Sequence, residues 1–160
     1  MKFIDENSLN RLNFKELLSR IDMYSGYGKS KLNNLSNFLV GEEEKLEEEF
    51  ERMQKILDFI SVNKKEEMEI EIILHRLKDI KKLVENTKAN IILDTVDLFE
   101  IKTQLMAMAD LNSCLKRNKE VFSDFILKDL DELFKILDPN NEKIATFYIY
   151  ESYSVILKEI

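Results

Sequence analysis

The chain has 160 residues, 44% of them hydrophobic and 34% charged, and its 31 acidic and 24 basic side chains give a net charge of −7. This length fits one domain, residues 1–160, and the chain is too apolar to be disordered throughout. With only three Gly and one Pro, the composition is typical of helices. The negative net charge argues against a phosphate-binding surface that covers the whole domain. Five basic and two acidic residues from Ser8 to Val40 still allow a local basic surface there.

The first helices are expected between residues 13 and 35. Asn13 offers an N-cap, and Glu16, three residues later, completes a capping-box pattern. Apolar residues then recur on one helical face as far as Tyr24. Gly26 and Gly28 are expected to end this helix, and a second short helix is expected over about 29–35.

An acidic helix is expected after Gly41. Its glutamates suit a helix N-terminus and a solvated face, and no loop geometry accompanies them that would indicate a calcium site. With only about two heptads, a helix packed in a globular domain is favoured over a free-standing coiled coil. Five apolar residues at spacings of 4, 3, 4 and 3 form what we call the heptad seam: Leu46, Phe50, Met53, Leu57 and Ile60.

The longest helix is expected within residues 90–116, after another helix over about 68–84 that contains a bend. Asp94 occupies the N-cap position, where its side chain can accept from the backbone N–H of Val96 or Asp97. No Gly or Pro interrupts the stretch, so one central helix from Thr95 to Lys116 is predicted. Its apolar face has helical spacing, with one polar member, and consists of Leu98, Ile101, Leu105, Met108, Asn112 and Leu115.

The C-terminal part combines a helix with the one expected strand. Asp129 is expected to cap a helix through Leu137, which Pro139 stops. Residues 145–150 (ATFYIY) are rich in aromatic and β-branched side chains and predict a strand, which needs a hairpin partner. Ser152 or Ser154 is expected to cap a last helix (SVILKEI), and the natural protein is expected to continue beyond it. The predicted fold class is all-α, a multihelical core domain with a short β-strand or hairpin near 145–150.

No pattern in the sequence predicts a catalytic, cofactor-binding or metal-binding site. Gly28-Lys29-Ser30 imitates the end of a phosphate-binding loop, but the first glycine of that loop and the preceding strand are missing. His75 is the only histidine and Cys114 the only cysteine, too few for a zinc site. We expect His75 to be structural or on the surface, and Cys114 to be a buried, inert thiol. The chain is therefore not expected to be an enzyme.

Three stretches, in this order, resemble the helical core (lever) domain of the MutS family of DNA repair ATPases. They are LNFKELLSRIDMYSGYGKSKLNNL near the start, HRLKDIKKLVENTKANIILDTVDLFEIKTQL in the middle and LDPNNEKIATFYIYESYSVILKEI near the end. The last resembles the segment that leads into the family's long lever helix. The resemblance to the core domain begins almost at Met1. In this respect the chain is similar to the subgroup of the family that lacks the N-terminal mismatch-recognition domain, or to another MutS-related protein.

The resemblance implies a domain that transmits conformational change between an ATPase region and a DNA clamp, without catalysis of its own. The central helix and the helix from Ser152 are the expected transmitting parts. ATP and Mg²⁺ are expected only in the ATPase domain of the parent protein, because no Walker A sequence is present here. The expected partners are the parent's other domains and, through the full-length protein, DNA. The fragment is expected to be monomeric and the parent a homodimer.

Two other functions remain open. A stand-alone helical interaction module would bind a partner helix through the heptad seam. A small helical enzyme would need a pocket in which polar groups converge around His75. The N-terminus has no apolar signal-peptide core and no apolar run approaches the roughly 18 residues of a membrane span, so a cytoplasmic location without membrane contact is expected.

Overall fold

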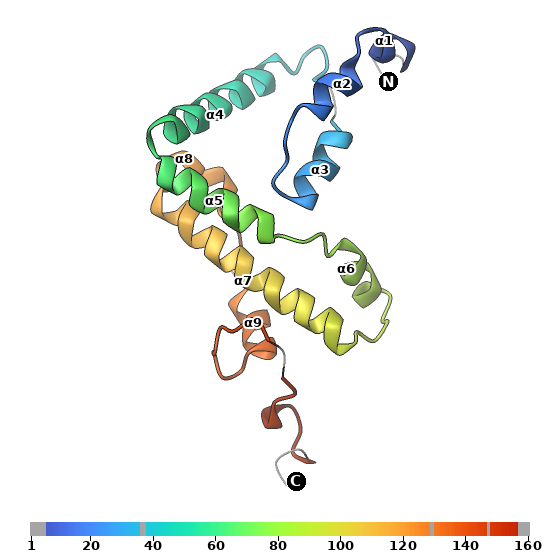
Figure 1. Cartoon of the computed structure of the whole chain (residues 1–160), viewed down its shortest axis with the longest axis vertical. Helices are drawn as coiled ribbons and strands as arrows, with labels where there is room; N and C mark the ends of the chain where they lie inside the picture. The colour runs from blue at the N-terminus through green and yellow to red at the C-terminus, as the bar shows by residue number, and fades with distance from the viewer. Residues whose placement is uncertain (1–5, 36–37, 129, 147, 157–160) are drawn as a thin grey trace.

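The computed structural model is organised around one long helix, α7 (Thr95–Arg117) (Figure 1). Its 23 residues span about 35 Å at the rise of an α-helix. The Asp94 side chain accepts a hydrogen bond from the N–H of Asp97 at 2.8 Å, and the Asp97 side chain accepts one from the N–H of Asp94 at 3.2 Å. The central helix and its N-cap are thus confirmed. The structure describes residues 6–35, 38–128, 130–146 and 148–156.

The fold is all-α, as the sequence predicts. No helix in the described part of the chain is both long enough and apolar enough to cross a membrane. Besides α7, the helices are α1 (Glu6–Arg11), α2 (Phe14–Ser19), α3 (Gly26–Asn33), α4 (Glu43–Val62), α5 (Lys64–Arg76), α6 (Lys81–Lys88), α8 (Lys119–Phe122) and α9 (Asp131–Leu137), with short 3-10 turns η1 (Ser123–Phe125) and η2 (Glu151–Tyr153).

The hydrophobic core lies where α5 packs along the C-terminal half of α7, with α8 and the end of α4 closing the cluster (Figure 1). Phe59 of α4 and Phe122 of α8 meet edge to face, with ring centroids 5.1 Å apart. Because α8 follows α7 after a single residue, the chain turns back at once and covers the α5–α7 contact. The buried members of the cluster are Ile73, Leu111, Cys114, Leu115 and Phe122.

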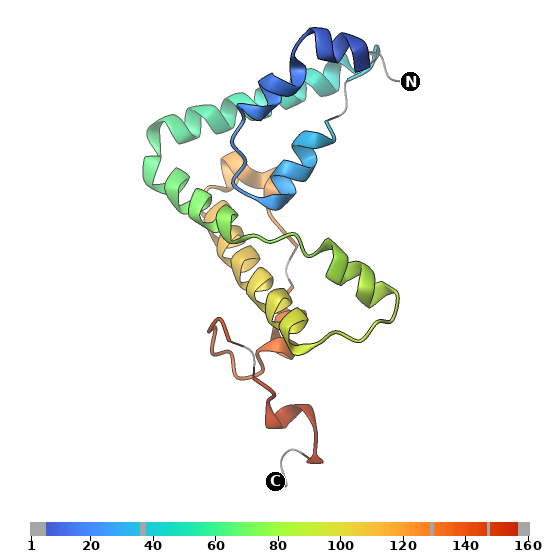
Figure 2. The same ribbon diagram turned by 45° about the vertical axis from the view of Figure 1, so that its right-hand side comes forward.

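The N-terminal helices α1–α3 lie to one side of this core, as two views show (Figures 1 and 2). The ring of Tyr24 meets His75 of α5 edge to face at 5.3 Å, and the Tyr27 hydroxyl accepts from the N–H of Ile80 at 3.1 Å. The accessible surface is 12835 Å², against about 8,400 Å² for a compact monomer of this mass. The molecule is therefore open, with many apolar side chains at its surface.

The expectation that Gly26 and Gly28 end a helix is wrong. The helix before them, α2, already ends at Ser19, and α3 begins at Gly26. Ser25 caps α3, because its hydroxyl accepts from the N–H of Gly28 at 3.0 Å. A serine followed by small residues suits a helix start as well as a helix end. The glycines alone therefore do not show whether a helix begins or ends there.

The capping box expected at Asn13 is also wrong. Asn13 does precede α2, but its backbone is left-handed (φ 50°) and its side chain makes no capping hydrogen bond. Glu16 instead accepts from Arg20 at 3.0 Å, one helical turn away. The single bent helix expected over about 68–84 is also wrong. The chain forms two helices there, α5 and α6, with a non-helical link between them.

The strand expected over residues 145–150 does not form in the described residues of that range; Phe147 lies outside them. The backbone there is engaged elsewhere. The N–H of Thr146 donates to the carbonyl of Ile144 at 2.8 Å, and the carbonyl of Thr146 accepts from the Lys102 ammonium at 2.9 Å. Without a partner strand, aromatic and β-branched composition cannot make a ladder.

The two other caps expected near the C-terminus fall partly outside the described residues. Asp129 is one of these, while α9 starts two residues later with no side-chain cap and stops at Leu137, ahead of Pro139 as predicted. Ser152 lies within η2. The Ser154 hydroxyl accepts from the N–H of Ile156 at 3.3 Å. The helix expected over 154–160 does not form an α-helix in its described residues 154–156, and its remainder, 157–160, lies outside the described residues.

Candidate functional site: polar anchors on the central helix

A buried ion pair joins the middle of α7 to the segment after α9. The Lys102 ammonium lies 3.2 Å from a carboxylate oxygen of Asp138, and both side chains are completely buried. The same ammonium donates to the carbonyl of Thr146 at 2.9 Å. One side chain of the central helix thus holds two points of the chain that lie eight residues apart.

Asp138 is held by more than its lysine. Its two carboxylate oxygens accept from the backbone N–H of Lys143 at 2.8 Å and from the Tyr150 hydroxyl at 3.1 Å. Burial alone would raise the pKa of Asp138, but these hydrogen bonds and the one from Lys102 outweigh it and hold the pKa below its usual value. Asp138 is therefore a carboxylate at neutral pH.

Tyr150 closes this network from the other side. Its ring centroid lies 6.0 Å from the Lys102 ammonium and 5.5 Å from the ring of Tyr153. Burial, followed by the nearby Asp138 carboxylate, raises the pKa of Tyr150 to about 12. The aromatic residues that suggested a strand therefore act as a cover over the ion pair.

Two other buried polar side chains of α7 hold further segments. The amide oxygen of Gln104, only 3% exposed, accepts from the backbone N–H of Lys78 in the α5–α6 link at 2.9 Å. The amide oxygen of Asn112 accepts from the N–H of Leu127 at 2.9 Å. In each case a helix side chain supplies a hydrogen bond that non-helical backbone lacks. We call Lys102, Gln104 and Asn112 the polar anchors.

Exposed ion pairs supplement the anchors along the α5–α7 contact. Arg76 meets Asp110 at 2.7 Å and Arg117 meets Glu69 at 2.5 Å. These side chains are about half exposed, so each pair contributes little to stability. The buried anchors thus dominate the polar attachment of α7 to its neighbours.

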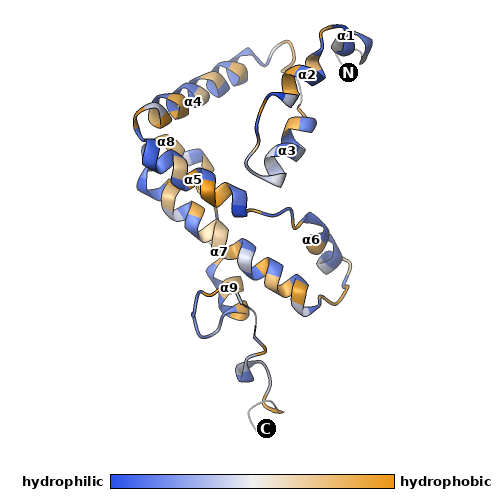
Figure 3. Ribbon diagram, in the orientation of Figure 1, coloured by the Kyte–Doolittle hydropathy of each residue, from blue (hydrophilic) through white to orange (hydrophobic). Residues whose placement is uncertain are grey.

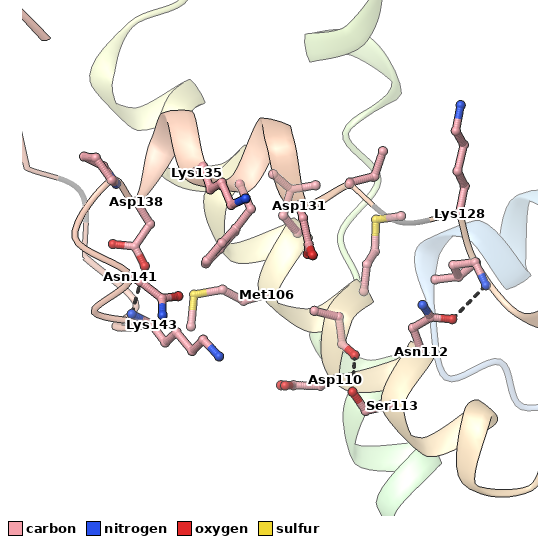
Figure 4. A pocket seen from close by; sticks show the side chains of 17 residues that line it. Met106, Asp110, Asn112, Ser113, Lys128, Asp131, Lys135, Asp138, Asn141 and Lys143 are labelled. Carbon is pink, nitrogen blue, oxygen red and sulfur yellow. Dashed lines mark hydrogen bonds between the residues drawn. The ribbon is translucent and has the colours of Figure 1, made fainter.

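A cavity of about 710 Å³ lies between α7, α9 and the segment that joins α8 to α9 (Figure 4). Figure 4 shows two of its polar side chains hydrogen-bonded to nearby backbone: Asn112 with Leu127, and Asp138 with Lys143. Three cationic side chains line the cavity, Lys128, Lys135 and Lys143, and the first two extend in different directions in the same view.

The residues that the sequence analysis weighed for chemistry lie apart from one another. His75 is exposed on α5 and contacts Tyr24. Cys114 is buried as predicted; burial, followed by its hydrogen bond with Glu69, raises the pKa of the thiol. Gly28-Lys29-Ser30 lies within α3. No group of three or more His, Cys, Asp or Glu in the described residues is arranged to hold a metal ion.

Of the polar anchors, only Asn112 stands out in the sequence, as the polar member of an apolar series. Lys102 and Gln104 read as ordinary residues of a charged helix. A usable signal was present, since Lys102 follows Ile101 and precedes Leu105 by three residues, so it borders the apolar face. Which acid would pair with it could not be read from spacing, because Asp138 is 36 residues away.

No protein-family model, curated protein or solved structure matches this chain. The resemblance to the MutS core domain therefore stays a prediction made from the sequence.

Proposed function

We propose that this chain is a non-catalytic helical lever in a cytoplasmic, MutS-like DNA repair or recombination ATPase that acts as a homodimer. In this role it passes conformational change between an ATPase domain and a DNA clamp elsewhere in the parent protein. ATP and Mg²⁺ bind only in that ATPase domain, and DNA contacts belong to the full-length protein.

The observation that carries the proposal is the attachment of α7 to three separate segments through buried polar anchors. A 23-residue helix without Gly or Pro moves as a unit. Since Gln104 holds the α5–α6 link and Lys102 holds the segment after α9, displacement at one end of α7 must displace both. A lever needs this combination of a stiff element and fixed attachments.

The first test is to read the source gene past Ile160. We expect a G-x-x-x-x-G-K-[ST] loop, preceded by a strand, in the parent protein. A reading frame without one contradicts the ATPase part of the proposal.

The second test uses the full-length protein with Lys102→Met. We expect basal ATP hydrolysis and DNA affinity to persist while the stimulation of hydrolysis by DNA falls several-fold, because the anchor between α7 and residues 138–146 is lost. Lys135→Met on exposed α9 makes the same chemical change and should leave stimulation intact. Equal stimulation in both variants would refute the lever role of α7.

A second candidate function is a stand-alone helical interaction module, favoured by the exposed apolar side chains of α4. Phe50 is 57% exposed, Met53 44% and Leu57 56%, whereas monomers usually bury such contiguous residues. An environment-sensitive apolar dye should bind the folded chain, and binding should fall in a Phe50→Ser, Leu57→Ser variant. A folded chain that binds no dye would rule this function out.

A further inference from the structure

The heptad seam of α4 faces solvent. Leu46 and Ile60 are half-buried, and the three residues between them are exposed. Figure 3 shows apolar positions recurring along α4 between hydrophilic ones. Their 4-3-4-3 spacing is the pattern that a second helix covers by knobs-into-holes packing. In the described part of this chain, no second helix covers the three exposed residues.

The neighbouring face of α4 is the one that holds the helix to the core. Ile56 and Phe59 pack against the buried cluster. Arg52 donates to Asp124 at 3.2 Å and lies 6.0 Å from the ring centroid of Phe125. Since α4 is already fixed through this side, the heptad seam is surplus to the packing of the chain itself.

The seam is bordered by negative charge. Between Glu42 and Val62 there are eight acidic and three basic residues. Two of the bases are engaged within the chain, because Lys45 pairs with Glu42 at 2.9 Å and Arg52 pairs with Glu49 at 2.6 Å. Glu47 is exposed on the flank of the seam, and Glu51 is exposed one row further round the helix; neither has a cation of the described chain within salt-bridge distance.

We propose that the heptad seam of α4 binds an amphipathic helix of a separate protein whose apolar stripe is flanked by Lys or Arg. This inference deepens the second candidate function and rests on it. The flanks of a heptad contact choose the partner by charge. A second copy of this chain is the poorer occupant, because either orientation places two acidic helices side by side.

The experiment measures binding of two synthetic helical peptides to the full chain. Both peptides carry Ile and Leu at the a and d positions of about three heptads; one has Lys at the flanking e and g positions and the other has Glu. Peptide fluorescence anisotropy gives the affinities at low and at moderate salt. The variants are Phe50→Ser with Leu57→Ser, and the control is Val62→Ser, an exposed apolar residue of the same helix outside the seam.

We expect the Lys peptide to bind at least about 10-fold more tightly than the Glu peptide, with the difference shrinking as salt rises. The seam variant should lose at least about 10-fold in affinity and the Val62→Ser control less than about two-fold. Equal affinity for both peptides, or no binding of either, overturns the proposal. If the dye still binds at the seam in that case, the second candidate function survives with a different partner.

Two further outcomes also count against the proposal. A dimer in sedimentation that the seam variant abolishes would make a second copy the occupant. Tighter peptide binding after Leu17→Ser with Ile21→Ser, at exposed positions in and just after α2, would show that the chain's own N-terminal segment covers the seam.

Discussion

Replacing Lys102 with Met should unfold the chain at markedly lower denaturant. Removing one partner of a buried ion pair costs about 3–5 kcal/mol, because the other charge stays behind in the interior. Here Asp138 keeps the hydrogen bonds from Lys143 and Tyr150, so a loss near the lower end, about 3 kcal/mol, is expected. For a chain of this size that corresponds to a fall in Tm of about 6–12 °C.

The assay is urea unfolding followed by far-ultraviolet circular dichroism, which suits a helical chain without Trp. Lys135→Met, at an exposed position, should change the free energy of unfolding by less than about 0.5 kcal/mol. Combining Lys102→Met with Asp138→Leu should cost less than the sum of the two single changes, since the stranded charge is gone. A loss below about 1 kcal/mol for Lys102→Met, or strict additivity, would refute the anchor.

Three further changes test separate features by the same unfolding assay. Gly26→Ala should stabilise the chain by about 0.5–1 kcal/mol, because Gly26 starts α3 and an added Cβ meets only an ordinary contact with Asp79 at 3.7 Å; destabilisation would mean that it ends a helix. Asp94→Ala should cost about 1 kcal/mol through loss of the N-cap of α7, and an unchanged midpoint would contradict the capping role. Burial and the Asp138 carboxylate raise the pKa of Tyr150 to about 12. The stability that the protonated Tyr150 hydroxyl contributes is therefore complete below pH about 10 and is lost as the pH rises through about 12. The ultraviolet absorbance of tyrosinate should show a late component that Tyr150→Phe removes, and simultaneous ionisation of all five tyrosines in the folded chain would refute this.

The sequence was sufficient where a structural rule is local. Asp94 and Asp97 cap α7 because both partners lie within one turn, and Pro139 ends α9 because its ring forbids continuation. Local rules gave the wrong result where one sequence pattern fits two different structures. The Gly26–Gly28 pair suits either end of a helix, and the deciding group was the hydroxyl of Ser25.

The candidate site was largely out of reach of sequence reasoning. Lys102 and Asp138 are 36 residues apart, and Gln104 binds a backbone group 26 residues away. No periodicity encodes such pairings. The aromatic stretch near Tyr150 shows the same limit, because its composition favours a strand, whereas tertiary contacts with Lys102 and Asp138 determine its conformation.

Contacts such as those of Tyr24 and Tyr27 hold α1–α3 beside the core. These helices can therefore open while the core stays closed. Opening of a segment costs only the contacts that the segment makes. Backbone amides of α1–α3 should therefore exchange with solvent deuterium far sooner than those of α5 and the C-terminal half of α7. A protease at low concentration should cut first around Gly41, whose left-handed backbone (φ 93°) lies between the two parts, and leave a resistant helical fragment that begins near α4.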